Sequence, residues 1–176
     1  MVFSVAMAVV GSSAMADHHE EKKAFSSQTI DLGVVVSDID RSAKFYKEAL
    51  GFKEVPGFDV PGDWANKVGL SDGSKLSVRV FVLGAGEAAT KLKLMQFPDV
   101  RSKRTDNRYI HSQLGFSYLT LHITDTTAAL ARLAKAKIKP IAGGTRELPK
   151  PLPQGVYLTI VRDPDGNLIE LVGPRG

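Results

Sequence analysis

The chain has 176 residues, 43% of them hydrophobic, and contains no cysteine. This length and apolar content predict one substantial core and argue against disorder over most of the chain. The absence of cysteine excludes disulfides, a thiolate nucleophile and Cys-based zinc sites. The net charge of +4 comes from 23 basic and 19 acidic residues spread along the sequence, so nucleic acid is not predicted as a partner.

The first sixteen residues have the pattern of a signal peptide. Residues 1–10 are almost entirely apolar, and the run from Gly11 ends in Ala14-Met15-Ala16 before the charged Asp17. The apolar run is shorter than the roughly 20 residues of a transmembrane helix. We therefore predict a signal peptide at 1–16, a flexible leader at 17–27, a periplasmic or secreted location, and no membrane attachment after cleavage.

The segment 28–97 has the pattern of a strand, a helix and three strands. Thr29 to Val36 is β-branched and apolar, and the apolar residues from Ile39 to Leu50 then recur at helical spacing until Gly51. Three further stretches predict strands at 52–55, 76–83 and 90–97. Between them, Asp63 to Leu70 predicts one short helix capped by Asp63, with Trp64 lying over a cavity or covering a hydrophobic surface.

The segment 115–174 repeats this pattern. It predicts a strand at 116–123, a helix after Asp125, and strands at 138–141, 156–162 and 167–172. The inward stripe of the helix is Ala129, Leu130, Leu133 and Ala136. Asp163 to Asn167 predicts a hairpin turn, because proline presets one dihedral and Asp-Gly accepts a positive φ. The sequence thus predicts an α+β fold of two βαβββ modules, at 28–97 and 115–174, within one domain at 28–176.

The two modules are joined by a polar connector at 98–114. Its basic residues are Arg101, Lys103, Arg104 and Arg108. The simplest interpretation is a solvated loop whose length suits a crossing from one sheet to the other. The alternative is a gate for anionic ligands.

Two groups of residues resemble the signature regions of a known family. They are residues 36–42 with Phe45-Tyr46 and Leu50-Gly51-Phe52, and residues 163–171. Together they resemble the vicinal oxygen chelate superfamily, which includes glyoxalases, extradiol dioxygenases, epimerases and bleomycin-resistance proteins. The resemblance covers nearly all of residues 28–174 and implies paired curved sheets around a cavity. It implies less about the reaction, because this fold hosts unlike chemistries and some pure binders.

The resemblance also implies where a metal site would lie. The four ligand positions of metal-dependent members fall on Asp31, Lys93, Tyr118 and Glu170, and only Glu170 matches the usual ligand. A protonated lysine has no lone pair and repels a cation. We therefore expect no cofactor and a cavity that contains these four residues. The predicted ligand is a small organic molecule, with an anion as one option.

Two further residues have more than one interpretation. Alternation along the strand places His122 on the same face as Tyr118, so His122 is either a displaced ligand or general base, or a structural residue. The candidate catalytic residues are thus Glu170, His122 and Tyr118. Arg79 points either into the cavity, toward an anion, or to the other side of its strand.

Three functions therefore compete. The leading hypothesis is an exported protein with a degenerate metal site that binds, or acts atypically on, a small organic ligand. The second is a metal-dependent glyoxalase-like lyase or dioxygenase, in which Glu170, His122 and Asp31 hold a divalent metal. The third is a dimeric interaction module whose cavity is filled by its own side chains. A homodimer is compatible with each of them.

Overall fold

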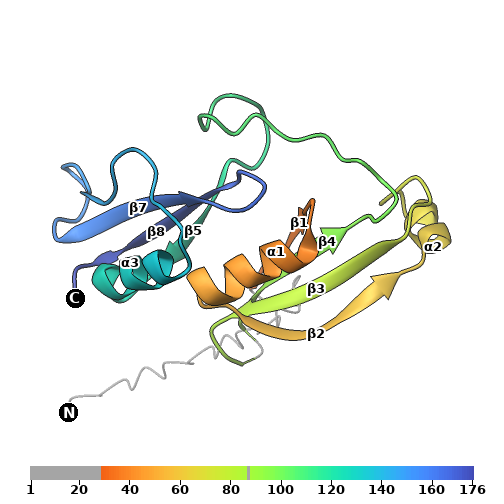
Figure 1. Ribbon diagram of the computed structural model, residues 1–176, viewed down its shortest axis with the longest axis horizontal. Coiled ribbons are helices and arrows are strands. Elements are labelled where there is room, and N and C mark those ends of the chain that lie inside the picture. Colours follow the sequence, from red (N-terminus) through yellow and green to blue (C-terminus); the bar gives the residue numbers. More distant parts are fainter. Residues whose placement is uncertain (1–28, 87) are drawn as a thin grey trace, which may run out of the picture.

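The structure, a computed structural model, describes residues 29–86 and 88–176. The predicted signal peptide at 1–16 and the leader at 17–27 lie outside these ranges. The described chain forms two four-stranded mixed sheets that lie side by side (Figure 1). Within these ranges, no helix has the length and apolar character needed to cross a membrane.

The first module is a sheet with the strand order β1-β4-β3-β2. Strand β1 comes first in this order and is therefore an edge strand. It runs parallel to β4, whereas the other neighbouring strands are antiparallel. Its elements are β1 (Leu32–Val35), α1 (Ile39–Lys44), the π-helix η1 (Phe45–Ala49), β2 (Lys53–Val60), α2 (Gly62–Lys67), β3 (Leu76–Leu83) and β4 (Thr90–Gln96).

The first helix begins and ends where the sequence predicts. The Asp38 carboxylate accepts a hydrogen bond from the Arg41 amide at 2.9 Å and caps the helix. Gly51 follows the last turn with φ of 85°, a conformation that glycine adopts without steric cost. Between these ends, the backbone changes from α1 to the wider π-helical turn of η1.

The second module repeats this topology with the strand order β5-β8-β7-β6, and β5 is its edge strand. Its elements are β5 (Tyr118–His122), α3 (Thr126–Lys135), β6 (Arg146–Glu147), β7 (Val156–Arg162) and β8 (Leu168–Pro174). Asp125 caps α3 by accepting from the Ala128 amide at 2.9 Å. The two copies of this arrangement confirm the predicted α+β fold of two βαβββ modules.

The hairpin between β7 and β8 is also confirmed. The Asp163 and Asn167 backbones are joined at 3.0 Å, and Gly166 has φ of 95°. The prediction of a strand at 138–141 was wrong: these residues form no strand, and the short β6 takes that place in the sheet. Pro140 has no amide hydrogen to donate to a ladder. The flanking residues Lys137 and Ala142 have positive φ, which breaks an extended backbone.

The short helix α2 begins differently from the prediction. Its N-cap is Pro61, which makes no side-chain capping bond, and Asp63 lies inside the first turn. The Asp63 carboxylate instead faces Lys67 at 3.9 Å, one turn along. The helix is anchored by Ala65, which is completely buried, whereas Trp64 is 53% exposed.

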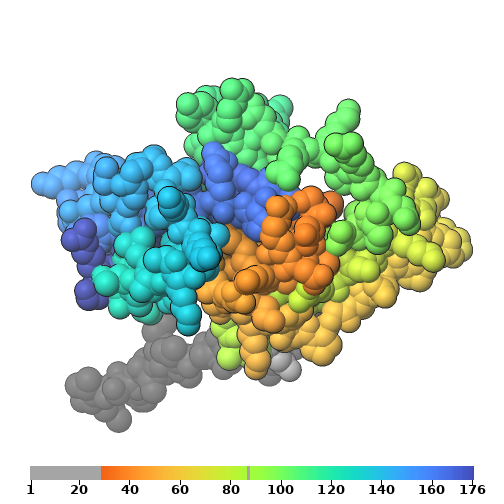
Figure 2. Space-filling view, in the orientation of Figure 1, coloured from red at the N-terminus to blue at the C-terminus, as the bar shows by residue number. Residues whose placement is uncertain are grey.

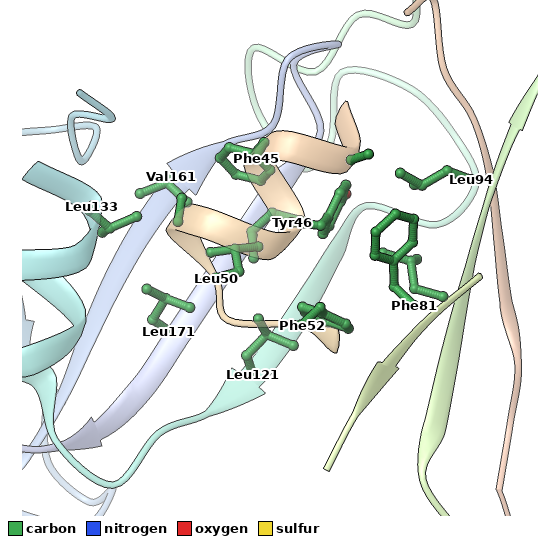
Figure 3. Packing of buried hydrophobic residues seen from close by; sticks show 14 of the residues in the cluster. Phe45, Tyr46, Leu50, Phe52, Phe81, Leu94, Leu121, Leu133, Val161 and Leu171 are labelled. Carbon is green, nitrogen blue, oxygen red and sulfur yellow. The ribbon is translucent and has the colours of Figure 1, made fainter. Parts of the chain in front are cut away.

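The main hydrophobic core lies between the two modules. Residues of α1 and η1 pack on one side against sheet one and on the other against sheet two and α3 (Figure 3). Tyr46 is central: it is 1% exposed and makes edge-to-face ring contacts with Phe45 and Phe52. The labelled contacts from the two sheets are Phe81 and Leu94 from module one, and Leu121, Val161 and Leu171 from module two.

One buried hydrogen bond also joins the modules. The Tyr46 hydroxyl donates to the Asp163 carboxylate at 3.0 Å, and this carboxylate also accepts from the Asp165 and Asn167 amides of the hairpin. Burial raises the pKa of Tyr46 well above its usual value, and the nearby Asp163 charge raises it further. The hydroxyl therefore stays protonated and holds the hairpin against the first module.

Candidate functional site

A large groove lies between the two edge strands, β1 and β5. Its volume is about 1010 Å³, at the upper end of the range found for small-molecule sites. We call it the inter-module groove. Residues 30–37 form one wall and residues 116–119 the other. Residues 100–105 of the connector also line it, and Figure 2 shows the connector, in green, standing above the junction of the modules.

In module one, the polar part of this region is an ion pair. The Lys93 Nζ lies 2.8 Å from the Asp31 Oδ2, and both side chains are about one-third exposed (34% and 37%). Strand register explains the contact: Gly33 pairs with Lys93, so Asp31, two residues earlier, extends on the same face. The hydrogen bond from Lys93 lowers the pKa of Asp31, so this carboxylate is ionised at neutral pH.

In module two, the polar residues lie on the face turned away from α3. Thr120 pairs with Glu170 across β5 and β8, and its hydroxyl donates to the carboxylate at 2.8 Å. Tyr118 and His122 share this face by alternation, and both are exposed. Leu121, on the opposite face, enters the core. The predicted alignment of Tyr118, Thr120 and His122 is therefore present.

The structure does not bring the four positions of the resemblance into one cluster. Asp31 and Tyr118 line the inter-module groove, whereas Lys93 and Glu170 are not among its lining residues. Within residues 29–86 and 88–176, no hydrogen bond or ion pair joins the Asp31–Lys93 pair to Glu170. The site is thus two polar pairs, one in each module, rather than a single quartet.

Arg79 lies on the other side of its sheet from Lys93. Lys93 pairs with Val80 across β3 and β4, so the neighbouring Arg79 points to the face that packs against α1. Its guanidinium donates to Glu54 and to Asp40, both at 2.7 Å. The cavity position considered for Arg79 is therefore wrong, and its charge is used within module one.

This network has a clear electrostatic signature. Hydrogen bonds from Arg79 and then from Lys47 lower the pKa of Glu54 to about 2. The same Glu54 bond raises the pKa of Arg79. The cluster connects β2 and β3 to the helical segment and stabilises the module.

A second polar cluster at the groove was not predicted. The Asp165 carboxylate accepts from the Ser37 hydroxyl and amide, at 2.5 and 3.0 Å. It also lies 3.7 Å from guanidinium nitrogens of Arg41 and Arg104. Ser37, Arg104 and Asp165 all line the inter-module groove. The turn and the basic connector are both visible in the sequence, but their contact is formed only by tertiary structure.

The connector is held in place by Arg162. Its guanidinium donates to the carbonyls of Asn107 and Gly166 at 2.6 and 2.8 Å, and to that of Arg108 at 3.1 Å. The Asn107 side chain also donates to Asn167 at 3.1 Å. These bonds fix the middle of the connector to the β7–β8 hairpin and leave residues 100–105 over the groove.

The residues present do not fit the family's four-ligand metal site. Lys93 has no lone pair for a metal, and its ammonium group is bound to Asp31. Glu170 accepts from Thr120, in the other module. Within the two described ranges, no three Asp, Glu, His or Cys side chains lie close enough together to hold a metal ion. The rearranged set of Glu170, His122 and Asp31 is therefore not assembled within this chain.

Known proteins with a similar sequence pattern or structure have this fold. The sequence matches the family described as the Glyoxalase/Bleomycin resistance protein/Dioxygenase superfamily over residues 29–171. The search of curated proteins gave no significant match. Among solved structures, a glyoxalase family protein from Bacillus cereus superposes with a TM-score of 0.69 at 19% identity, covering 89% of this chain and 99% of that one.

Two glyoxalase I enzymes are also similar in structure. The trypanothione-dependent enzyme of Leishmania major has a TM-score of 0.58 at 26% identity, with 84% of this chain and 87% of that chain covered. The enzyme of Zea mays has a TM-score of 0.60 at 19% identity and covers 84% of this chain, which spans 45% of the maize chain. The family match extends over most of the sequence and the same fold recurs in these structures, so the chain belongs to the glyoxalase/bleomycin resistance protein/dioxygenase superfamily.

Proposed function

We propose that the protein binds a small organic molecule in the inter-module groove and does so without the family's usual catalytic metal. The observation that supports this proposal is a groove of about 1010 Å³ lined by Asp31, whose carboxylate pairs with Lys93, a residue at a position where the resemblance to the family implies a metal ligand. Apolar walls with a few polar groups are typical of small-molecule sites. Whether the bound molecule is also converted depends on the groups near it, of which Tyr118 lines the groove directly.

A blocked groove tests the binding. Val35 lines the groove and is 43% exposed, so Val35→Trp fills space there, and strands accept aromatic residues. Val68, at the end of α2, is 54% exposed and is not among the lining residues, which makes Val68→Trp a matched control.

The measurement is ligand-observed NMR against a library of small organic acids, amines, alcohols and amides. We expect a set of ligands whose signals respond to the wild type and to Val68→Trp but not to Val35→Trp. A library without ligands, or ligands indifferent to Val35→Trp, would contradict the proposal.

Metal loading tests the second hypothesis, the lyase or dioxygenase with a rearranged site. Many members of this family depend on a metal, and three protein donors with open positions suffice for Lewis-acid chemistry. We would purify the chain from Asp17 without a tag, reload it with zinc, manganese, iron or nickel, and measure metal content by elemental analysis. Near-stoichiometric metal that disappears in Glu170→Gln would replace our proposal with the enzyme hypothesis.

The third hypothesis, a dimeric interaction module, draws support from one surface feature. Leu114, at the end of the connector, and Phe116, at the start of module two, are fully exposed, and exposed apolar patches often mark interfaces. The open volume of the groove argues against a cavity filled by its own side chains. Sedimentation velocity of the wild type and of Leu114→Ser/Phe116→Ser tests for a homodimer, which is expected to dissociate in the double variant.

Export of the protein rests on the sequence of residues 1–16 alone. The N-terminal sequence of the protein recovered outside the cytoplasm provides the test. We expect it to begin at Asp17, after the Ala14-Met15-Ala16 pattern. Recovery of the full-length chain in the cytoplasm would exclude a cleaved signal peptide.

A further inference from the structure

The walls of the inter-module groove are largely apolar. Side chains from both edge strands and from the ends of the connector face this space. The apolar lining residues include Ile30, Val34, Val35, Phe97, Phe116 and Leu119. Ile30 is 73% exposed and Phe116 is completely exposed, an arrangement that costs free energy in water and is relieved when an apolar body covers them.

The connector adds positive charge at the rim of the same groove. Arg101, Lys103 and Arg104 line it and lie within a segment of four residues. In the part of the chain that the structure describes, neither Arg101 nor Lys103 makes an ion pair or a hydrogen bond. Arg104 lies 3.7 Å from Asp165 and is 65% exposed. We call Arg101, Lys103 and Arg104 the basic rim.

The carboxylates at the groove do not neutralise this charge. Two line it, Asp31 and Asp165, and both already have cationic partners. Asp31 pairs with Lys93, and Asp165 is shared between Arg41 and Arg104. The charges of Arg101 and Lys103 are therefore left without an internal counter-ion in a groove whose walls are largely apolar.

We infer that the ligand of this groove is an amphiphilic organic anion, with an apolar chain or ring held between β1 and β5 and a terminal carboxylate held by the basic rim. This inference rests on the proposed function and names its ligand class. The positive charge is confined to one short segment of the groove edge, which suits a single anionic head group. A polyanion would need cations distributed along an extended surface.

The basic rim is then the element that determines specificity. A carboxylate gains charge-assisted hydrogen bonds from arginine and lysine, whereas an uncharged amide of the same shape does not. Because the rim is exposed, these interactions are screened by salt, so the preference for the anion should weaken as ionic strength rises. Arg162 fixes the connector to the β7–β8 hairpin and so keeps the rim near the walls.

The experiment compares two probes of nearly identical shape, 6-phenylhexanoate and 6-phenylhexanamide, by isothermal titration calorimetry with the full chain. The rim variant is Arg101→Gln/Lys103→Gln, which leaves the Arg104–Asp165 contact in place. The control is Arg132→Gln/Lys135→Gln on α3, which removes the same charge away from the groove.

We expect the carboxylate to bind about tenfold more tightly than the amide at low salt, and the rim variant to weaken the carboxylate about five- to tenfold. The rim variant should leave the amide unchanged, and the α3 control should leave both probes unchanged.

Equal affinities for the two probes would overturn the inference, as would equal losses in the rim and α3 variants or no binding of either probe. If the two probes bind equally and Val35→Trp blocks both, the groove still binds small molecules and only the anion preference fails. If neither probe binds, the library experiment decides separately whether the proposed function survives.

Discussion

The two modules share one backbone plan but differ on one face of each sheet, the face opposite to α1 in module one and to α3 in module two. In module one, α2 covers part of this face and forms a second core in which Ala65 packs against Leu76, Val78 and Val80. Within residues 115–176, all of which the structure describes, no helix corresponds to α2. Module two instead presents Tyr118, Thr120, His122 and Glu170 on its open face. This face is therefore partly packed in module one, whereas in module two it carries polar side chains that are exposed (Tyr118, His122) or half-buried (Thr120, Glu170).

The largest loss of stability is expected from a substitution in the core between the two modules. Tyr46→Ala removes a buried ring from the shared core and should lower the free energy of unfolding by about 3–5 kcal/mol, measured by urea denaturation. Tyr46→Phe keeps the ring and should cost about 1–2 kcal/mol, because Asp163 loses one of its donors. A loss below about 1 kcal/mol for Tyr46→Ala would mean that the modules fold without support from each other.

The second core tests whether α2 stabilises module one. Leu76 is 2% exposed, so Leu76→Ala should lower the free energy of unfolding by about 2–4 kcal/mol. Leu70, which follows α2 and is 57% exposed, provides the control, and Leu70→Ala should change stability by less than about 0.5 kcal/mol. Similar losses in both variants would show that the second core is not a specific packing unit.

The ion pairs of Glu54, in module one, predict that the free energy of unfolding depends on pH. The pKa of Glu54 is about 2 in the fold against an ordinary value of 4.5. A lowered carboxyl pKa stabilises the fold above the ordinary value, and this contribution disappears as the pH falls from 4.5 toward 2. At pH 7, Glu54→Gln should cost about 1 kcal/mol in urea denaturation, a value reduced by partial exposure.

The matched control for this prediction is Glu48→Gln. Glu48 is exposed on η1, and among the described residues no hydrogen bond or ion pair involves its carboxylate. The difference between wild type and Glu54→Gln should close at low pH, whereas Glu48→Gln should match the wild type throughout. A constant difference for Glu54→Gln at every pH would indicate a packing effect instead.

The smallest expected effect is at the Asp31–Lys93 ion pair. Lys93→Met should raise the pKa of Asp31 toward its ordinary value, because the main cause of its lowering is the hydrogen bond from Lys93. Stability should change by less than about 1 kcal/mol, because both side chains are about one-third exposed. Titration of the Asp31 carboxyl carbon by NMR measures the pKa.

Lys91→Met is the control for this titration. Lys91 is a weaker, purely coulombic cause of the lowered Asp31 pKa, so its removal should move that pKa less than Lys93→Met does. Equal shifts in the two variants would mean that general positive charge, rather than the specific pair, keeps Asp31 ionised.

Much of the local structure was readable from single residues. Asp38 and Asp125 cap the two long helical segments, Gly51 ends the first of them, and the turn at 163–167 forms the predicted hairpin. The strand predicted at 138–141 does not form, and Pro140 gives a local reason. The prediction followed the apolar residues around Pro140 and gave too little weight to the proline. The cap of α2 was misplaced by two residues, because Pro61 begins the helix without a side-chain bond.

The site itself was only partly predictable. Alternation in Ser77 to Phe81 shows that Arg79 and Val80 lie on opposite faces, but only the register with β4 shows which face carries Lys93. The contact of Lys93 with Asp31 follows from the parallel pairing of β1 and β4. The meeting of Asp165 with Ser37 and Arg104 joins residues from three separate segments, and no local pattern indicates it.

By itself, the sequence determined the repeated βαβββ plan and the resemblance to the family. These features depend on residue type, periodicity and short turns, which act over a few neighbouring residues. Only the tertiary structure decided that Asp31 and Lys93 form an ion pair apart from Glu170, which accepts from Thr120, and that the basic rim lines a groove between two edge strands. Those features depend on how the two modules pack around Tyr46, which is set by contacts between residues far apart in the chain.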